Sequence, residues 1–280
     1  MMTAHKYLLL FCFSASIACA QLATTDDGQE LLLPTYWRLP GESYAPQHYG
    51  IYRGGRTGWN AVVQNIQGEF LSRPFLSSDG SVAAWDRSIP CTGSCMLPVP
   101  RVFTEFQGLT LPASISAYDL RLSRNARFLL SPGFLGLSDL VLVDLSTGRR
   151  WTAPEAPTLR ALSVANDGTV LGLVASREGG IANAVVPNRV VAWRPGGEKT
   201  SVFEADRVAN GWLSADGARA LVEVAGTADQ PRDLWWVDIT TQARQRIAQL
   251  APDGELTFLY AANHQISNDG SRVLSLWPSQ

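Results

Sequence analysis

A short polar turn that recurs at nearly regular intervals is the feature that most constrains how this chain can fold. The turn contains Asp-Gly and precedes a run of apolar residues at Asp79, Asp167, Asp216 and Asp269, and a weaker copy occurs at Asn125. In chain order, successive copies are 46, 42, 49 and 53 residues apart. A period of roughly 40–50 residues with several strands per unit is typical of β-propeller blades.

Each Asp-Gly pair is predicted to form a tight hairpin turn. Glycine supplies the positive φ that such turns demand, and an aspartate side chain hydrogen-bonds the backbone just ahead of it. Calcium binding is the alternative, but each turn has too few neighbouring carboxylates for an oxygen cage. The predicted structural turn residues are therefore Asp79, Gly80, Asp167, Gly168, Asp216, Gly217, Asp269 and Gly270.

A second element repeats out of phase with the first, and consists of an apolar strand followed by a polar turn. Its copies are Leu140–Gly148, Val190–Gly197, Leu234–Thr241 and, more loosely, Ala61–Gly68. We expect the Asp-Gly turn to join the two inner strands of a blade and this element to join the two outer ones. The strands are nearly continuous hydrophobes, as expected where a sheet is packed on both faces, and most tryptophans should pack between blades.

The predicted fold is an all-β propeller of about five four-stranded blades over residues 56–280, preceded by an extended segment at 21–55. The C-terminal hairpin Ile266–Trp277 supplies only an inner pair of strands, whereas Ala61–Phe70 resembles an outer pair. Pairing the two would close the ring and remove exposed strand edges. The alternative is an open fragment of a six- to seven-bladed propeller.

The N-terminus has the layout of a cleavable secretory signal over residues 1–20. Its apolar run, Tyr7–Ile17, is 11 residues long, and a membrane-spanning helix needs roughly 20. Cleavage after Ala20 would leave a periplasmic or secreted protein without a transmembrane segment. The alternative is a lipoprotein anchored to the membrane through Cys19.

Cys91 and Cys95 are the two cysteines outside that signal, and they flank a turn-like Thr-Gly-Ser sequence. In an oxidising compartment so close a pair is most simply a disulfide. A redox-active pair would need a feature that lowers the thiol pKa, and a metal site would need two further ligands. We expect a disulfide, with the other two readings as alternatives.

The composition gives no sign of a nucleic-acid partner, a cofactor or an enzyme. After cleavage, 22 Lys and Arg stand against 25 Asp and Glu, a slightly acidic balance that does not attract phosphate backbones. His48 and His264 are expected on the surface or in loops, and no Gly-x-Ser-x-Gly elbow accompanies them. We therefore expect no catalytic, cofactor-binding or metal-binding residues.

The repeated unit resembles that of TolB-type propellers over residues 61–280, where a Ser-x-Asp-Gly hairpin precedes a strand that ends in Asp and Thr-Gly. The family's usual proline is replaced by Ser78, Ala215 and Asn268. The resemblance implies a periplasmic platform for protein interactions with no catalytic residues, so the partner would be an unknown protein or envelope component. The alternative is a propeller enzyme, or a propeller that gates a substrate, with its site at the central channel.

Overall fold

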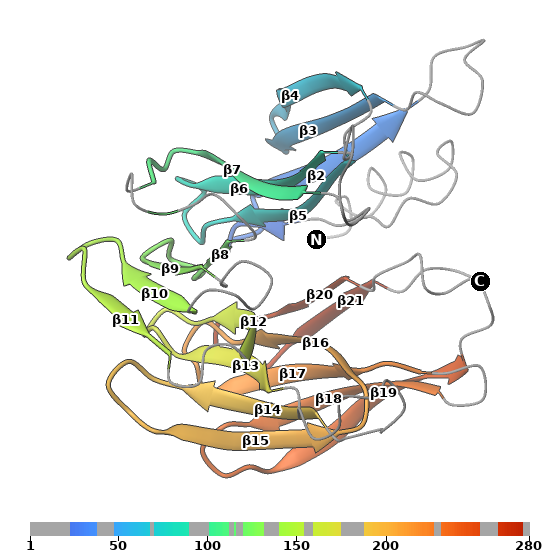
Figure 1. Ribbon diagram of the computed structural model, residues 1–280. Helices are drawn as coiled ribbons and strands as arrows, with labels where there is room; N and C mark the ends of the chain where they lie inside the picture. The colour runs from blue at the N-terminus through green and yellow to red at the C-terminus, as the bar shows by residue number, and fades with distance from the viewer. Residues whose placement is uncertain are drawn as a thin grey trace, which may run out of the picture.

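The computed structural model describes residues 23–37, 48–67, 70–89, 101–111, 115, 120–131, 140–153, 159–174, 188–226, 231–252 and 263–276. Every regular element in these ranges is a β-strand, and the strands form six antiparallel sheets, numbered here in chain order. Figure 1 shows the sheets following one another from sheet 1 (blue) through sheet 3 (green) to sheets 5 and 6 (orange and red). The predicted all-β class is confirmed.

Four of the sheets contain four strands each. Sheet 1 consists of β1 (Ala23–Thr24), β2 (Glu30–Trp37), β3 (His48–Gly55) and β4 (Gly58–Gln67). Sheet 3 consists of β8 (Arg121–Leu122), β9 (Phe128–Ser131), β10 (Val141–Asp144) and β11 (Arg150–Thr152). Sheet 4 consists of β12 (Leu159–Val164), β13 (Val170–Val174), β14 (Asn188–Trp193) and β15 (Lys199–Ala205). Sheet 5 consists of β16 (Val208–Leu213), β17 (Arg219–Val224), β18 (Pro231–Asp238) and β19 (Arg244–Pro252).

The other two sheets have fewer strands within the described ranges. Sheet 2 consists of β5 (Phe70–Leu76), β6 (Ala83–Ile89) and β7 (Arg101–Gln107). Sheet 6 consists of β20 (Asn263–Ile266) and β21 (Val273–Leu276). In all six sheets each strand pairs with the next strand in the chain, so every sheet is a simple meander.

The two repeated sequence elements occupy the two kinds of hairpin that they were predicted to form. The Asp-Gly turns join the first and second strands of their sheets, and the second element joins the third and fourth strands in sheets 3, 4 and 5. Ala61–Gly68 was assigned wrongly to this element, because its described part, residues 61–67, lies within β4. The turn between β3 and β4 instead falls at Arg56 and Thr57, where Gly58 has a φ of +132°.

The predicted closure by pairing residues 61–70 with residues 271–277 is wrong. β4 pairs with β3, with Ile51 opposite Val63, and β21 pairs with β20 in a sheet of their own. Residues 61–67 need no distant partner, because the inner hairpin of their sheet comes from β1 and β2. Among the described residues, sheet structure is therefore already present at Ala23, before residue 56, and the strands form six sheets where about five blades were expected.

The core lies between neighbouring sheets. Along β13 all five residues are buried, but they alternate between two clusters: Val170 packs with Phe128 and Trp193 toward sheet 3, whereas Leu171 packs with Leu213 toward sheet 5. This confirms that a continuous apolar strand here means burial on both faces. Similar clusters join sheet 1 to sheet 2 and sheet 2 to sheet 3.

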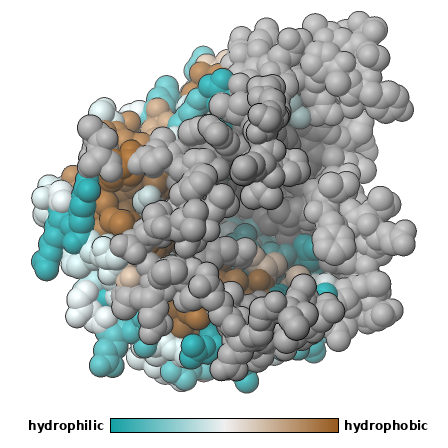
Figure 2. Space-filling model, viewed as in Figure 1, coloured by the Kyte–Doolittle hydropathy of each residue, from teal (hydrophilic) through white to brown (hydrophobic). Residues whose placement is uncertain are grey.

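Trp85 and Trp193 follow the expected packing between sheets, since both are buried in these clusters, whereas Trp59 is 44% exposed and does not. On the face drawn in Figure 2, hydrophilic residues gather along the left and lower edges and apolar residues lie between them. The buried apolar side chains gather in the clusters between neighbouring sheets.

The first sheet should be essential to the fold, and this can be tested with two adjacent leucines of β2. Leu32 is fully buried against sheet 2 beside Leu76 and Trp85, so Leu32→Ala should lower the free energy of unfolding by about 2–5 kcal/mol. Leu31, on the opposite face and only partly buried, is the matched control and should lose clearly less. Equal, small losses in denaturant melts would mean that sheet 1 is not part of the cooperative core.

Candidate interaction surface

The turn between β5 and β6 shows how the Asp-Gly sequence folds. The Ser77 hydroxyl donates to Asp79 Oδ1 at 2.7 Å, and the same carboxylate oxygen accepts the Ser81 backbone N–H at 3.0 Å. The Ser77 hydroxyl oxygen also accepts the Val82 N–H at 2.9 Å. Gly80 has a φ of +73°, which favours glycine. The Asp79 carboxylate thus organises its own turn.

Five of the six first-to-second-strand turns share this geometry, with a hydroxyl residue two positions before the acid or amide. The pairs are Thr25 with Asp27, Ser77 with Asp79, Ser123 with Asn125, Ser214 with Asp216, and Ser267 with Asp269. The turn of sheet 4 differs, because Ala165 takes the place of the serine. There Asp167 accepts bonds from the N–H and the hydroxyl of Thr169, at 2.8 and 2.9 Å.

The sequence analysis missed the first of these turns, at Thr25-Asp26-Asp27-Gly28. Thr25 replaces the serine, and its hydroxyl oxygen accepts the Glu30 N–H at 3.1 Å just as Ser77 accepts that of Val82. The signal was present, since Asp-Gly is followed there by the apolar run Leu31–Leu33. Extending the repeat to the N-terminal side of residue 56 would have found it.

These turns place a ring of polar side chains at one end of the molecule, which we call the crown: Asp27, Asp79, Asn125, Asp167, Asp216 and Asp269. All six are exposed. The Ser81 N–H and the hydroxyls of Ser77 and Ser81 lower the pKa of Asp79 to about 2. Hydrogen bonds from Thr25 and from Ser267 are the main causes that lower the pKa values of Asp27 and Asp269. These carboxylates are therefore ionised at neutral pH.

Neighbouring turns are joined to one another by hydrogen bonds. Each turn donates to the next: Asp26 N–H to Ser78 O at 3.1 Å, Ser78 N–H to Arg124 O at 2.8 Å, Asn125 N–H to Asn166 Oδ1 at 2.8 Å, Asn166 N–H to Ala215 O at 2.8 Å, and Asp216 N–H to Asn268 O at 3.1 Å. The sixth turn returns to the first, because the Asn268 amide donates to Asp26 Oδ2. The six turns therefore form a closed ring.

Arg124 connects three sheets within that ring. From sheet 3 it donates to Asp26 Oδ1 at 3.1 Å and to the Thr24 carbonyl at 2.5 Å, both in sheet 1. It also donates to the Leu76 carbonyl of sheet 2 at 3.1 Å. The carboxylate of Asp26 thus receives Arg124 on one oxygen and Asn268 on the other, so it joins both ends of the described chain.

A second set of contacts lies around the ring. Arg53 of sheet 1 donates to the carbonyl of Gly80 in sheet 2 at 2.6 Å. The Trp236 indole N–H of sheet 5 donates to the carbonyl of Gly270 in sheet 6 at 3.1 Å. In these two turns the glycine carbonyl accepts a hydrogen bond from a side chain of the preceding sheet. These turns are therefore stabilised by side chains as well as by the neighbouring turns.

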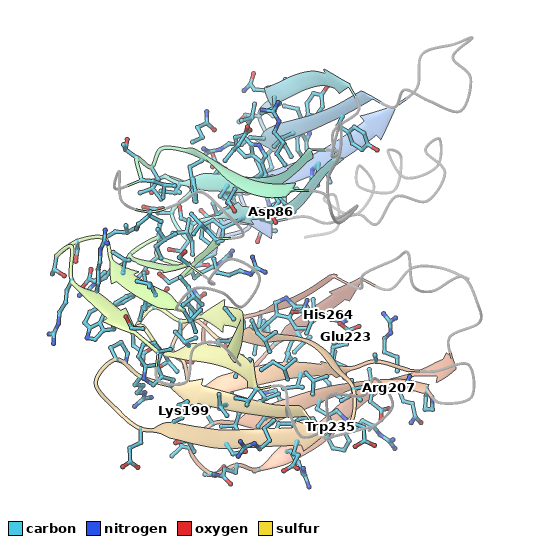
Figure 3. All side chains as sticks on the ribbon, viewed as in Figure 1. Asp86, Lys199, Arg207, Glu223, Trp235 and His264 are labelled. Carbon is cyan, nitrogen blue, oxygen red and sulfur yellow. The ribbon has the colours of Figure 1, made fainter. Side chains whose placement is uncertain are left out.

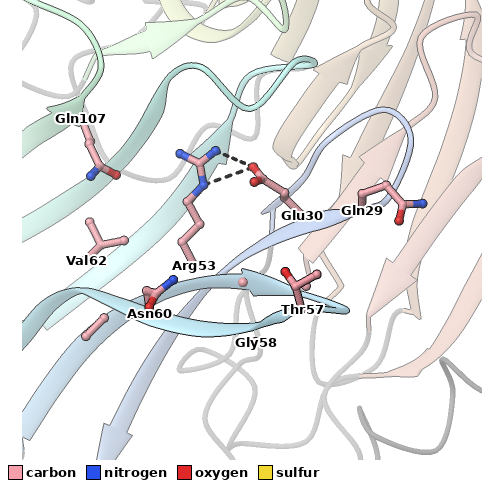
Figure 4. A pocket seen from close by; sticks show the side chains of 11 residues that line it. Gln29, Glu30, Arg53, Thr57, Gly58, Asn60, Val62 and Gln107 are labelled. Carbon is pink, nitrogen blue, oxygen red and sulfur yellow. Dashed lines mark hydrogen bonds and ion pairs between the residues drawn. The ribbon is translucent and has the colours of Figure 1, made fainter.

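A pocket of about 360 Å³ opens beside the crown between sheets 1 and 2. Figure 4 shows Glu30 and Arg53 joined within it, with Asn60 and Thr57 on the β3–β4 hairpin and Gln107 at the end of β7. Arg53 Nε lies 3.2 Å from Glu30 Oε2, and Nη2 also contacts that oxygen. The pocket is mostly polar and carries one acid and one base.

Two buried polar side chains are Glu223 on β17 of sheet 5 and His264 on β20 of sheet 6, both labelled in Figure 3. His264 is 1% exposed, so its expected place on the surface or in a loop is wrong. Its ring meets Trp212 edge-on, with centroids 4.9 Å apart. Burial, with a smaller effect from the charge of Arg232, lowers its pKa to about 4. Arg232 in turn pairs with Glu223 at 3.1 Å.

Asp86 in sheet 2 is a second buried acid that the sequence analysis missed. It accepts a hydrogen bond from the Thr104 hydroxyl at 2.9 Å, and the Thr104 oxygen accepts the Leu120 N–H at 3.0 Å. This short network ties sheet 2 to the start of sheet 3. Its sequence signal was weak, because Asp86 stands in an ordinary alternating strand.

Several predicted features lie outside the described residues and remain predictions. They are the signal at residues 1–20, the disulfide between Cys91 and Cys95, and the side chain of His48. In the part of the chain that is described, no helix is long and apolar enough to cross a membrane. Nor do those ranges contain a group of three or more histidine, cysteine, aspartate or glutamate residues arranged to hold a metal ion.

Comparisons with known proteins identify the fold. No family model and no curated protein matches the sequence, but solved structures do. TolB from Acinetobacter baumannii superposes with a TM-score of 0.52 at 13% identity, covering 84% of this chain and 55% of that one. This chain has a TolB-type β-propeller fold. A TolB-like protein from Agrobacterium tumefaciens matches with a TM-score of 0.50 at 13% identity, over 92% of this chain and 90% of that one.

The same fold occurs in chains of other kinds. A prolyl endopeptidase matches with a TM-score of 0.54 at 12% identity, over 84% of this chain and 36% of its own length. The chain thus spans about half the length of the A. baumannii TolB and about a third of the endopeptidase. The predicted resemblance is confirmed for the fold.

The ring of turns should depend on Arg124. Arg124→Gln removes charged hydrogen bonds to Asp26 and to two carbonyls, and should lower the free energy of unfolding by about 1–3 kcal/mol. Arg194→Gln is the matched control, because the Arg194 side chain is 64% exposed and bonds only within its own sheet. Comparable losses in both variants, measured by chemical denaturation, would contradict a special role for Arg124.

His264 should make the protein sensitive to acid in a defined pH range. Its pKa is lowered in the folded state from 6.5 to about 4, so the unfolded chain binds a proton first as the pH falls. Above pH 6.5 His264 is neutral in both states and costs no stability. Between pH 6.5 and pH 4 the free energy of unfolding falls by about 3 kcal/mol in all, because only the unfolded chain takes up the proton. His264→Phe should flatten that decline in melts at pH 7, 5.5 and 4.5. An unchanged slope would show that other groups cause it.

Proposed function

We propose that the protein is an exported, non-catalytic propeller of the cell envelope, and that it binds a protein or other envelope component with its crown end. The closed ring of turns is the observation that carries this proposal. Six turns bonded to their neighbours form a surface whose shape is set before binding, and a preorganised surface loses less conformational entropy when a partner docks.

The charge of the crown favours one kind of partner. Five aspartates surround the ring, and those at 27, 79 and 269 have lowered pKa values. Carboxylates fixed in this way attract a basic surface and repel an acidic one, which directs orientation and association rate more than affinity. A partner with Lys or Arg residues around its contact area would fit this end of the propeller.

The fold comparison supports a platform role through TolB, and the sequence supports export through the signal at residues 1–20. Export to the periplasm, with cleavage between Ala20 and Gln21, is part of the proposal, as is the disulfide between Cys91 and Cys95. So is the absence of catalysis by this chain.

Photo-crosslinking from the two ends of the propeller tests this function. A photoreactive residue at Asn125 or Asp216 of the crown should capture the same envelope protein in living cells, and added salt should weaken the capture. The same residue at Arg207, in the exposed turn between β15 and β16 at the far end of the strands (Figure 3), is the control and should capture nothing specific.

The outcomes are distinct. Equal capture from both ends, or capture from Arg207 alone, would contradict binding at the crown. N-terminal sequencing of the same purified protein should begin at Gln21. Retention of residues 1–20, or a diacylated Cys19, would contradict the proposed processing without bearing on the crown.

A further inference from the structure

The pocket between sheets 1 and 2 has a chemical character that the crown does not share. Its volume of about 360 Å³ lies within the ~300–1,000 Å³ range of small-molecule sites. Two different sheets build it, because Gln107 comes from the end of β7 and the remaining lining residues come from sheet 1. The pocket therefore exists only when the two sheets are packed together.

The charged groups in the pocket cancel. Glu30 and Arg53 form an ion pair, and the guanidinium also donates to the Gly80 carbonyl. Their side chains are 43% and 27% exposed, so the pair borders the open space while it helps to hold sheet 2. An ionic ligand would have to compete with a bond already made, and the pocket has no second charge to offer it.

The remaining polar groups are suited to hydroxyls. Asn60 and Gln107 carry amides, and Thr57 carries a hydroxyl; all three are exposed, and none makes a side-chain hydrogen bond to another described residue. An amide presents a donor and an acceptor side by side, and a hydroxyl can act as either. A ligand hydroxyl, which also donates and accepts, can bond to any of them.

Part of the lining between these groups is apolar or lacks a side chain. Gly55 and Gly58 contribute backbone only, and Val62 adds an apolar side chain. Gly55 has no room for a side chain, since a Cβ there would lie 2.0 Å from the Gln29 carbonyl. One part of the pocket lining thus has no bulky side chain, and hydrogen-bonding side chains surround that part (Figure 4).

We propose that this pocket binds a neutral sugar unit, either free or at the end of a glycan chain. A sugar ring has apolar C–H groups to place against Val62 and the glycines and several hydroxyls for the polar side chains, and it carries no charge to disturb the Glu30–Arg53 pair. Asn60 and Gln107 bind hydroxyls from two different sheets, and Glu30 accepts from another hydroxyl. This site is independent of protein binding at the crown.

Titration of the purified full chain with sugars tests the proposal. The probes are glucose, galactose, N-acetylglucosamine and a β-linked disaccharide of each, with glucuronate and glucosamine as charged comparisons, followed by calorimetry or by protein NMR shifts. We expect at least one neutral probe to bind in the millimolar range and its charged counterpart to bind no better. A disaccharide that binds more tightly than its monomer would indicate the end of a glycan chain.

Matched variants link the binding to the pocket. Asn60→Ala and Gln107→Ala each remove one exposed amide and should weaken the neutral sugar roughly three- to tenfold, as expected for one neutral hydrogen bond. Gln245→Ala on β19 is the control, because Gln245 is exposed on a different sheet, and it should leave binding unchanged. Equal thermal midpoints in all three variants show that folding is intact.

Three results would overturn the proposal: no binding of any neutral probe up to about 50 mM, tighter binding of the charged probes, or binding that neither pocket variant weakens. None of these outcomes depends on a crosslinked partner at the crown. Failure of the sugar site and failure of the proposed function are therefore separable.

Discussion

The structure depends on hydrogen bonds between turns that are far apart in the sequence. Each sheet is a meander of strands that are adjacent in the sequence. The pairing within such a sheet does not fix its position relative to the next sheet. The backbone N–H groups of the turns supply that information, because four of them donate to a carbonyl of the following turn and one donates to the Asn166 side chain. Buried or confined backbone groups must be paired, so each turn fixes the position of its neighbour.

Asp26 completes this arrangement, because it binds Arg124 of sheet 3 and Asn268 of sheet 6 as well as the turn of sheet 2. The sequence led us to expect closure by a sheet that shares strands from both chain ends. Here the described strands of sheets 1 and 6 remain separate, and their turns make the connection. The crown is exposed and acidic because the side chains that organise the turns, five of them aspartates, lie at the surface.

Much of the fold could be predicted from the sequence, because the turns are short-range structures. The Ser-x-Asp-Gly sequences predicted the hairpins of sheets 2, 5 and 6. The continuous apolar run Val170–Val174 predicted a strand that is buried on both faces. The first hairpin, at Thr25–Gly28, was not predicted, so residues 61–67 lacked an inner hairpin, and this led to the wrong closure. The ring itself, the burial of His264 and the pocket could not be predicted, since each depends on contacts between sheets that no local pattern encodes.

Amide hydrogen exchange measured by NMR tests the closed ring most directly. The N–H groups of Asp26, Ser78, Asn125, Asn166 and Asp216 lie in surface turns, where exchange is ordinarily fast, yet each donates to the neighbouring turn. A closed ring predicts that all five are protected together, and that Arg124→Gln accelerates their exchange. Exchange of these five amides at the rate of an unstructured peptide would contradict the ring, whatever the stability of the sheets.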